Sequence, residues 1–350
     1  MRAHKDSRVD EEKRVSRYTS ELKRIFVSAR SKHQAHERSR PVLEDISTDP
    51  IFIRAILRRY LADPKVLNAK NYPVIGVNIE LSPHYHLVAN CWIPLPNHEK
   101  NISTKTIHHH GTMLLTTTTV FGPGYEHWLF TQPNELDPVR ELYEMEVTDR
   151  KLHRRHDVAF VDAFEPHLPF YPAGLTVTLA LWSTRNPTTW KDRLKRIPVL
   201  KANEATLRCF LRRAGLAKKL ELKRAEYFDF YPTDVGFKGM KDRVEFGLGP
   251  NEDYLQSLFH VLQETQNDGL GPLVEQHLNS GKISFTNSPK IKRLMQDLKD
   301  GRSIEGKLSD CHLGVPHATF KSQDIDRTVT ALRAVKKGVL PKGSLCQPIR

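Results

Sequence analysis

The chain has 350 residues, of which 39% are hydrophobic and 27% charged, and its formal net charge is +13. Such a length suits one large domain or two ordinary ones, and the apolar fraction excludes a fully disordered chain because it can supply a core. No stretch reaches the ~18 apolar residues of a membrane span, and the amino terminus lacks the apolar segment of a secretion signal. We therefore expect a cytoplasmic protein with no membrane partner.

The first forty residues are charged and poorly periodic, which predicts a frayed helical arm. Asp49 and Pro50 then form a favourable helix start, and apolar residues follow at i, i+3, i+4 and i+7. These are Ile53, Ile56, Leu57 and Tyr60. One amphipathic helix is expected at about residues 50–62.

From Tyr72 the period changes to that of β-strands, with turn signals between short apolar runs. The predicted strands are Val74–Leu81, His84–Ile93, Lys105–His110, Met113–Phe121, Glu126–Thr131, Glu141–Val147, Asp157–Ala163 and Leu175–Ser183. About eight strands at this spacing are typical of a barrel or jelly roll rather than of alternating β–α units.

After Pro187 the pattern becomes mainly helical. Two apolar stripes carry the prediction: Leu207, Phe210, Leu211 and Ala214 in the first, and Leu255, Leu258, Phe259 and Leu262, after a capping Asn251, in the second. The segment 227–249 receives no assignment, and the tail from Lys336 is expected to be loose. We therefore expect a mixed β + α chain with an N-terminal helical arm (1–70), a β-barrel (71–185) and a mainly helical C-terminal region (186–350).

Positive charge is concentrated in residues 185–224, which carry thirteen Lys and Arg against three Asp and Glu. A cluster of this kind can attract nucleic acid or another acidic partner. It can equally be the solvated face of a helix. The charge alone leaves nucleic acid open as a partner.

Several familiar signatures are absent from the sequence. Cys91, Cys209, Cys311 and Cys346 show no CxxC spacing, so neither a disulfide framework nor a cysteine zinc site is predicted. His312 and His317 stand near Cys311 in a loop without helical spacing. There is also no P-loop, GxGxxG, HExxH or GxSxG motif, which argues against the common nucleotide, flavin, zincin and serine-hydrolase classes.

Three consecutive histidines provide the strongest chemical signal. Residues i and i+2 of a strand point to the same face, so His108 and His110 project together while His109 points away. Such a pair can give two imidazoles to one metal ion. Three histidines on a solvated strand are the alternative.

The surrounding sequence resembles the cupin metalloenzymes, and in particular the cysteine dioxygenase group. An apolar strand, His86 to Pro94, ends in Cys91-Trp92, and a polar loop leads to Ile107-His108-His109-His110-Gly111. The run Gly122-Pro123-Gly124-Tyr125-Glu126-His127-Trp128 matches the hairpin that follows. In that family a third histidine comes some fifty to sixty residues later, and His167 lies 57 residues after His110. The resemblance covers about residues 72–185 and implies a cupin-like double-stranded β-helix, or jelly-roll, barrel with a three-histidine metal site.

The departures from that family also carry information. Many cupins have a glutamate ligand shortly after the histidine pair, where this chain has Leu114, Leu115 and Thr116. Thiol dioxygenases carry a His-x-Tyr pair at the positions occupied here by Ala180 and Trp182, and residues 74–81 contain no arginine to grip a substrate carboxylate. A site of three histidines is therefore favoured, and cysteine is not expected as the substrate.

Three neutral imidazoles suit Fe(II), Zn, Ni or Cu and leave the ion its full charge, which attracts an anionic or chelating small molecule. Fe(II) with dioxygen is preferred by resemblance, and a non-redox hydrolase or isomerase is a competitor. In the third hypothesis the barrel is only a scaffold and the protein binds nucleic acid or acts as a regulator.

Aromatic residues expected on inward faces of the barrel are candidates for the wall of the active site. They are Tyr125, Trp128, Phe170, Tyr171 and Trp182, each of which can equally be ordinary core. His86 is a candidate acid or base, with surface exposure as the alternative for it and for His84. Arg154, Arg155 and His156 could hold an anionic substrate or form a basic turn.

Overall fold

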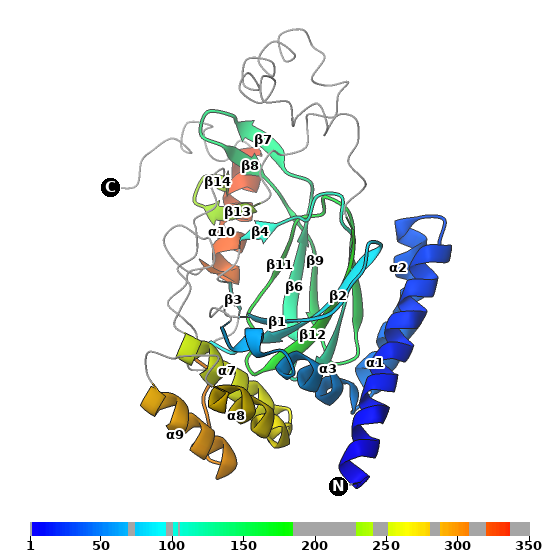
Figure 1. Ribbon diagram of the computed structural model, residues 1–350. Helices are drawn as coiled ribbons and strands as arrows, with labels where there is room; N and C mark the ends of the chain where they lie inside the picture. The colour runs from blue at the N-terminus through cyan, green and yellow to red at the C-terminus, as the bar shows by residue number, and fades with distance from the viewer. Residues whose placement is uncertain are drawn as a thin grey trace, which may run out of the picture.

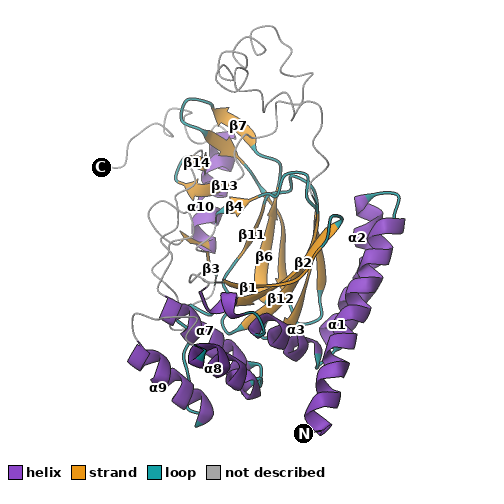
Figure 2. Ribbon diagram, viewed as in Figure 1, coloured by secondary structure: helices purple, strands orange, loops and turns teal. Residues whose placement is uncertain are grey.

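The computed structural model describes residues 2–68, 74–95, 101–103, 106–184, 229–240, 251–280, 288–307 and 320–336. Within these ranges two antiparallel β-sheets face each other and helices cover their outer faces (Figure 1, Figure 2). The predicted helix at residues 207–214, the basic run 185–224, the histidines near Cys311 and the tail beyond Lys336 lie outside the described residues.

One sheet has five strands. In spatial order they are β1 (Val74–Leu81), β2 (Tyr85–Trp92), β12 (Thr176–Ser183), β5 (Leu115–Phe121) and β10 (Val158–Val161). The facing sheet has eight strands. In spatial order they are β7 (Asn134–Asp137), β8 (Leu142–Glu144), β14 (Gly236–Gly239), β13 (Asp229–Thr233), β4 (Ile107–His108), β11 (His167–Pro169), β6 (Tyr125–Phe130) and β9 (Val147–His153). A short pair joins β3 (Ile102–Ser103) to β15 (Phe320–Lys321).

The chain passes back and forth between the two sheets. Strands β2, β5, β10 and β12 belong to the five-stranded sheet, whereas β4, β6, β9 and β11 belong to the other. This alternation is the jelly-roll, or double-stranded β-helix, architecture. The predicted mixed β + α fold is confirmed.

Helices lie at both ends of the described chain. They are α1 (Arg2–Ser28), α2 (Lys32–Thr48), α3 (Phe52–Leu61), α7 (Asn251–Glu264), α8 (Gly271–Asn279), α9 (Ser288–Lys299) and α10 (Ser322–Lys336), with 3-10 turns at Pro64–Asn68 and Asp268–Leu270. The expected helix near 50–62 is α3, and the four apolar residues predicted to form a stripe after Asn251 are fully buried in α7. No described helix combines the length and the apolar character that crossing a bilayer demands.

The central strands β5 and β12 of the five-stranded sheet are buried on both faces. Leu87 and Ala89 of β2 and Leu179 of β12 point into a core shared with the helices, and each is 0% exposed. The alternate residues of the same strands face the interior of the barrel. Because both of its faces are covered, β12 contains the apolar run Leu179-Ala180-Leu181-Trp182 rather than a strict polar and apolar alternation.

The first forty residues differ from the expected frayed arm. Val15, Tyr18, Leu22 and Ile25 recur at helical spacing on α1 and are all buried, and α2 lies beside α1 against the outer face of the barrel. Charged residues occupy the other faces of these helices, so the overall composition of the segment does not reveal the apolar stripe.

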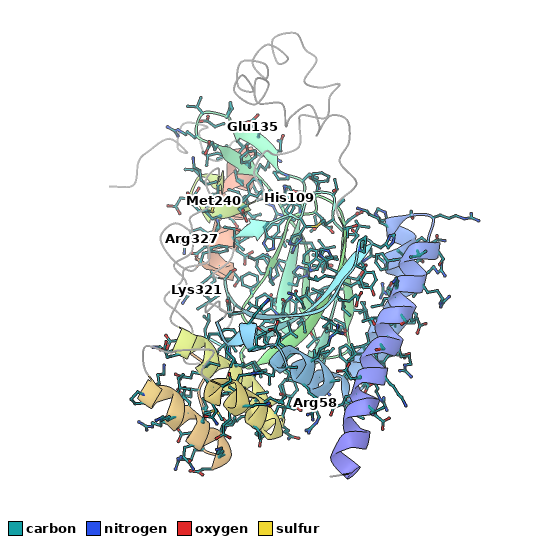
Figure 3. All side chains as sticks on the ribbon, in the orientation of Figure 1. Arg58, His109, Glu135, Met240, Lys321 and Arg327 are labelled. Carbon is teal, nitrogen blue, oxygen red and sulfur yellow. The ribbon has the colours of Figure 1, made fainter. Side chains whose placement is uncertain are left out.

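Buried ion pairs attach α1 to the following segment. Glu11, 3% exposed, accepts hydrogen bonds from Arg54 and from Arg58, which is labelled in Figure 3. Asp49 accepts from Arg14 at 2.9 Å and from the Tyr18 hydroxyl at 3.0 Å. The N-terminal helices are therefore part of the packed structure.

Several strands escaped the sequence analysis. The predicted strand Glu141–Val147 contains β8 and only the first residue of β9. Most side chains of β9 are exposed, and three of the strand's residues are charged. Strand β11 has only three residues, too few to show a period. Strands β13 and β14 fall in the segment left unassigned, and they join the eight-stranded sheet beside β4.

A glycine is required at the hairpin between β5 and β6. Gly122 and Gly124 have φ values of 87° and 84°, which residues other than glycine rarely adopt. A Cβ at Gly124 would lie 1.9 Å from the carbonyl oxygen of His153. This hairpin therefore brings β6 close to β9, and β6 carries residues that flank the histidine cluster.

Candidate metal centre

Two short strands place the first and third histidines of the predicted site. His108 of β4 and His167 of β11 are direct antiparallel partners, so their side chains leave the sheet on the same face. His110 lies just after the end of β4, not within a strand as expected. Its ring still meets the other two.

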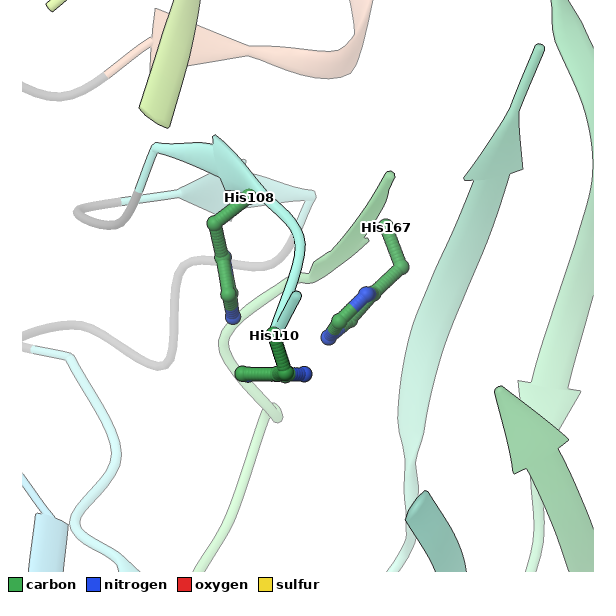
Figure 4. Close-up of side chains that lie close together, drawn as sticks. All are labelled: His108, His110 and His167. Atoms are coloured by element: carbon green, nitrogen blue, oxygen red, sulfur yellow. The ribbon is translucent and has the colours of Figure 1, made fainter. Parts of the chain in front are cut away.

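The three imidazoles converge on one point (Figure 4). One nitrogen of each ring lies within 4.8 Å of the corresponding nitrogens of the other two. The ring centres are 4.5 Å apart for His108 and His167, 4.5 Å for His110 and His167, and 4.9 Å for His108 and His110. Spacings of this size allow all three to bind one ion at the usual ~2.0–2.1 Å from a ring nitrogen.

Backbone carbonyls fix the protonation of two of these rings. The Nδ1 of His108 lies 2.8 Å from the carbonyl oxygen of Thr106, and the Nδ1 of His167 lies 3.0 Å from that of Glu165. A carbonyl oxygen only accepts, so each Nδ1 carries the proton and donates it. The lone pair of each neutral ring is then on Nε2, the arrangement found in metal-binding histidines.

His109 takes no part in the cluster. Its Nδ1 accepts a hydrogen bond from the backbone N–H of Gly111 at 3.2 Å, and its ring packs against Phe164. Gly111 has a φ of 63°, which turns the chain after the histidines. The consecutive histidines therefore divide into two that converge and one that points away, as the strand period predicts.

Trp182 is the predicted wall residue that touches the cluster. Its ring centre lies 4.2 Å from that of His110, with the two planes nearly perpendicular. His86 is directly opposite Trp182 on β2, so it shares that face of the sheet, but its side chain is exposed. His86 therefore lies at the surface of the barrel, and Trp182 stands between it and the histidine cluster.

The two predicted tyrosines lie deeper in the barrel. Tyr125 stacks on Trp92 with ring centres 5.8 Å apart, and burial raises the pKa of its phenol to about 12. Tyr171 packs edge-on against the same indole and belongs to a cluster with Val74. Both therefore pack around Trp92, while Trp182 packs directly on His110.

The other candidates take different places. Trp128 and Phe170 pack against each other in the core on the outer side of the eight-stranded sheet. His84, Arg154, Arg155 and His156 are exposed.

The sequence analysis missed two histidines inside the barrel. His127, 4% exposed, lies 5.3 Å from His167 between ring centres, and His153, 2% exposed, lies 4.9 Å from His127. Burial lowers the pKa of His127 well below its ordinary value and that of His153 to about 4. His127 follows Tyr125 by two residues, so strand spacing places it on the same inward face and could have identified it. His153 lies on β9, which was not predicted, so no such spacing was available for it.

The donor set determines what the centre can do. Three neutral imidazoles leave a divalent ion its full +2 charge and open positions for other ligands. Leu114, near where many cupins have a glutamate, is 1% exposed and supplies no carboxylate. Across the part of the chain that the structure describes, no other group of three His, Cys, Asp or Glu side chains is arranged to hold an ion.

Comparison with known proteins gives only distant similarity. No family model and no curated protein matches the chain. Among solved structures, KdgF from a Halomonas species is 11% identical and covers 33% of this chain and 81% of its own, with a TM-score of 0.22. A cupin superfamily protein from Desulfitobacterium hafniense is 12% identical over 33% of this chain and 83% of its own, with a TM-score of 0.20.

A third solved structure is hydroquinone 1,2-dioxygenase from a Sphingomonas species with 4-hydroxybenzoate bound. It is 12% identical over 37% of this chain and 77% of its own, with a TM-score of 0.24. The assignment of the fold rests on the strand order and not on these scores. That order makes the barrel a double-stranded β-helix, or jelly roll. It carries a three-histidine cluster able to hold a divalent ion, and the particular resemblance to cysteine dioxygenases is not established by these comparisons.

Proposed function

We propose that this protein is a mononuclear non-heme iron oxygenase that binds Fe(II) through His108, His110 and His167. The observation that carries the proposal is the convergence of three imidazoles within 4.8 Å inside the barrel. Two of them are held by carbonyls in the tautomer that metal binding needs.

Bound Fe(II) would supply the open coordination positions at which a substrate and dioxygen can meet. The protein's own residues would orient and shield that centre. Trp182 covers one side of His110 with an apolar surface, which limits water there. The buried phenol of Tyr125, with its raised pKa, stays protonated near neutral pH and can donate a hydrogen bond.

The proposed substrate is a small molecule with a chelating or anionic group. A site with three neutral ligands favours such a group because it offsets the charge of the ion. Trp182 stands where thiol dioxygenases have a tyrosine, and its indole packs on His110. The chain therefore departs from the cysteine dioxygenases at the centre itself, and we do not propose cysteine as the substrate.

A non-redox metal enzyme, a hydrolase or isomerase, is the second candidate. The same ligands suit Zn, Ni or Cu, and a Lewis-acid ion could activate water or a substrate oxygen. A nucleic-acid-binding protein on a cupin scaffold keeps support only from the basic run 185–224. The cytoplasmic location and the division at residues 70 and 185 also remain predictions.

The deciding experiment measures metal content in full-length protein purified without a histidine tag, beside His110→Ala. We expect about one iron per chain in the wild type, little in the variant, and oxygen uptake with a chelating substrate. His84→Ala, which changes an exposed histidine in the turn between β1 and β2, is the matched control and should keep its metal. Equal metal in wild type and His110→Ala would refute the site.

The same samples separate the alternatives. Stoichiometric zinc without oxygen uptake would favour the non-redox enzyme. Steeply salt-dependent binding to DNA or RNA that survives His108→Ala would favour the nucleic-acid hypothesis.

A further inference from the structure

A pocket of about 670 Å³ lies where the two sheets of the barrel fail to meet. Strand β9 is one edge of the eight-stranded sheet and β10 is one edge of the five-stranded sheet, and α2 lies beside this gap. We call it the seam pocket. Its volume is within the usual range of about 300–1,000 Å³ for small-molecule sites. Its lining includes His127, Leu129, Asp149, His153, Ala159 and Phe160.

The seam pocket and the histidine cluster share one face of the same sheet. Leu129 pairs directly with Asp149 on one side and with His167 on the other, and His167 pairs with His108. Directly opposed residues of antiparallel strands point to the same face. This cross-strand row therefore runs from the lining of the pocket to the candidate metal ligands, with only Leu129 between Asp149 and His167.

His153 offers hydrogen-bonding capacity that the described protein does not use. It is 2% exposed, lines the pocket, and both of its ring nitrogens lack a hydrogen-bond partner among the described residues. Buried polar atoms are normally paired, because leaving them unpaired costs free energy. The two unpaired ring nitrogens of His153 therefore suggest that a bound molecule pairs with them. A neutral imidazole has one donor and one acceptor, the combination that a hydroxyl group can complement.

The charges of the lining largely cancel. Arg40 and Lys151 stand against Glu44, Asp149 and Asp157, a formal excess of one negative charge, and the Lys151 ammonium lies 2.6 Å from the Asp149 carboxylate. Burial keeps the pKa of His153 at about 4, so its ring adds no charge near neutral pH. Leu129, Ala159 and Phe160 supply apolar surface.

We propose that the seam pocket binds the apolar body of an uncharged, hydroxyl-bearing small molecule, with its hydroxyl on His153, and holds it beside the three-histidine centre. Calling this molecule the substrate rests on the proposed function; the binding site itself does not. The inference narrows the expected substrate from any anionic or chelating molecule to one whose body is neutral and whose chelating group reaches past Leu129.

The test uses full-length, metal-free protein labelled in its histidine rings and three probes with the same benzene ring. Benzyl alcohol, benzoate and benzylamine differ only in carrying a hydroxyl, a carboxylate or an ammonium group. We expect benzyl alcohol to shift the His153 signals and to bind about tenfold more tightly than either ion, a difference of one good hydrogen bond. Tighter binding of benzoate, or equal binding of all three probes, would overturn the proposal.

Variants locate the site. Ala159→Phe should fill the pocket and weaken all three probes, while His153→Phe should abolish the preference for the alcohol, read from the neighbouring His127. His153→Gln keeps a donor and an acceptor and should retain part of that preference, and it decides the case if His153→Phe does not fold. His84→Phe on the exposed turn is the control. Unchanged alcohol binding in Ala159→Phe would place the probe elsewhere and refute the site.

The two proposals fail separately. Because the probes are measured without metal, selective alcohol binding by a protein that proves to take up no iron would support the seam pocket and overturn the oxygenase.

Discussion

His108 and His167 lie directly opposite each other on neighbouring antiparallel strands, and their ring centres are 4.5 Å apart. They are separated by 59 residues in the chain. The hydrogen bonds from their Nδ1 atoms go to carbonyls two residues earlier in each case. The strand register and these hydrogen bonds orient both rings, so a metal would meet a preorganised site.

Metal binding should stabilise the folded protein. An ion that binds only the native state adds about 2.7 kcal/mol to the free energy of unfolding when free metal is 100 times the dissociation constant. We expect a chelator to lower the melting temperature of the metal-loaded protein, and added Fe(II) under anaerobic conditions to restore it. His167→Ala should show no response to metal. A metal-dependent shift of the same size in that variant would place the ion elsewhere.

Trp182 should support metal binding through its contact with His110. Trp182→Ala removes the ring that packs 4.2 Å from the imidazole, and we expect the metal dissociation constant to rise about tenfold, at the lower end of the effects seen for residues that orient ligands. Trp182→Phe keeps part of the packing and should lie between the two. A competition titration with a coloured chelator measures this. An unchanged dissociation constant in Trp182→Ala would show that the contact does not orient His110.

Acid should destabilise the protein through its buried histidines. Burial lowers the pKa of His36 to about 4, below the ordinary value of 6.5. Below pH 6.5 the unfolded chain gains a proton that the folded chain does not, so stability is retained above pH 6.5 and is lost as the pH falls toward 4. Between pH 7 and pH 5 this single group should remove about 2 kcal/mol from the free energy of unfolding.

His36→Gln tests this pH dependence. Glutamine can keep the hydrogen bond to the Thr116 hydroxyl, which lies 2.8 Å from the Nδ1 of His36, but it does not titrate. Urea unfolding of metal-free protein at pH 7 and pH 5 should show a smaller loss in the variant than in the wild type. Equal losses would mean that His36 is not the source.

The N-terminal helices should contribute to stability. Leu22 of α1 is 0% exposed in the core shared with the five-stranded sheet, so Leu22→Ala should lower the free energy of unfolding by about 2–5 kcal/mol. Val27 of the same helix is 60% exposed, and Val27→Ala should change it by no more than about 0.5 kcal/mol. Denaturant unfolding measures both. If both variants changed the free energy of unfolding by a similar small amount, the N-terminal helices would not be packed against the barrel.

Local patterns predicted much of the jelly-roll barrel and part of its candidate metal centre. The strand period of β1, the glycines of the β5–β6 hairpin and the apolar stripe of α3 are properties of neighbouring residues, and the structure confirms them. The i, i+2 spacing also separated His108 and His110 from His109, although His110 lies beyond the end of β4. These features are local because backbone period and turn geometry depend on residues a few positions apart.

Long-range pairing decided the rest. The meeting of His167 with His108, the burial of His127 and His153, and the seam pocket between β9 and β10 all depend on which strand edges face each other. Strands with exposed, charged side chains, such as β9, have no apolar period from which a strand could be predicted. By itself the sequence determined the kind of barrel and two neighbouring candidate ligands. Only the tertiary structure brought together side chains from distant strands, because that register follows from packing of the whole barrel.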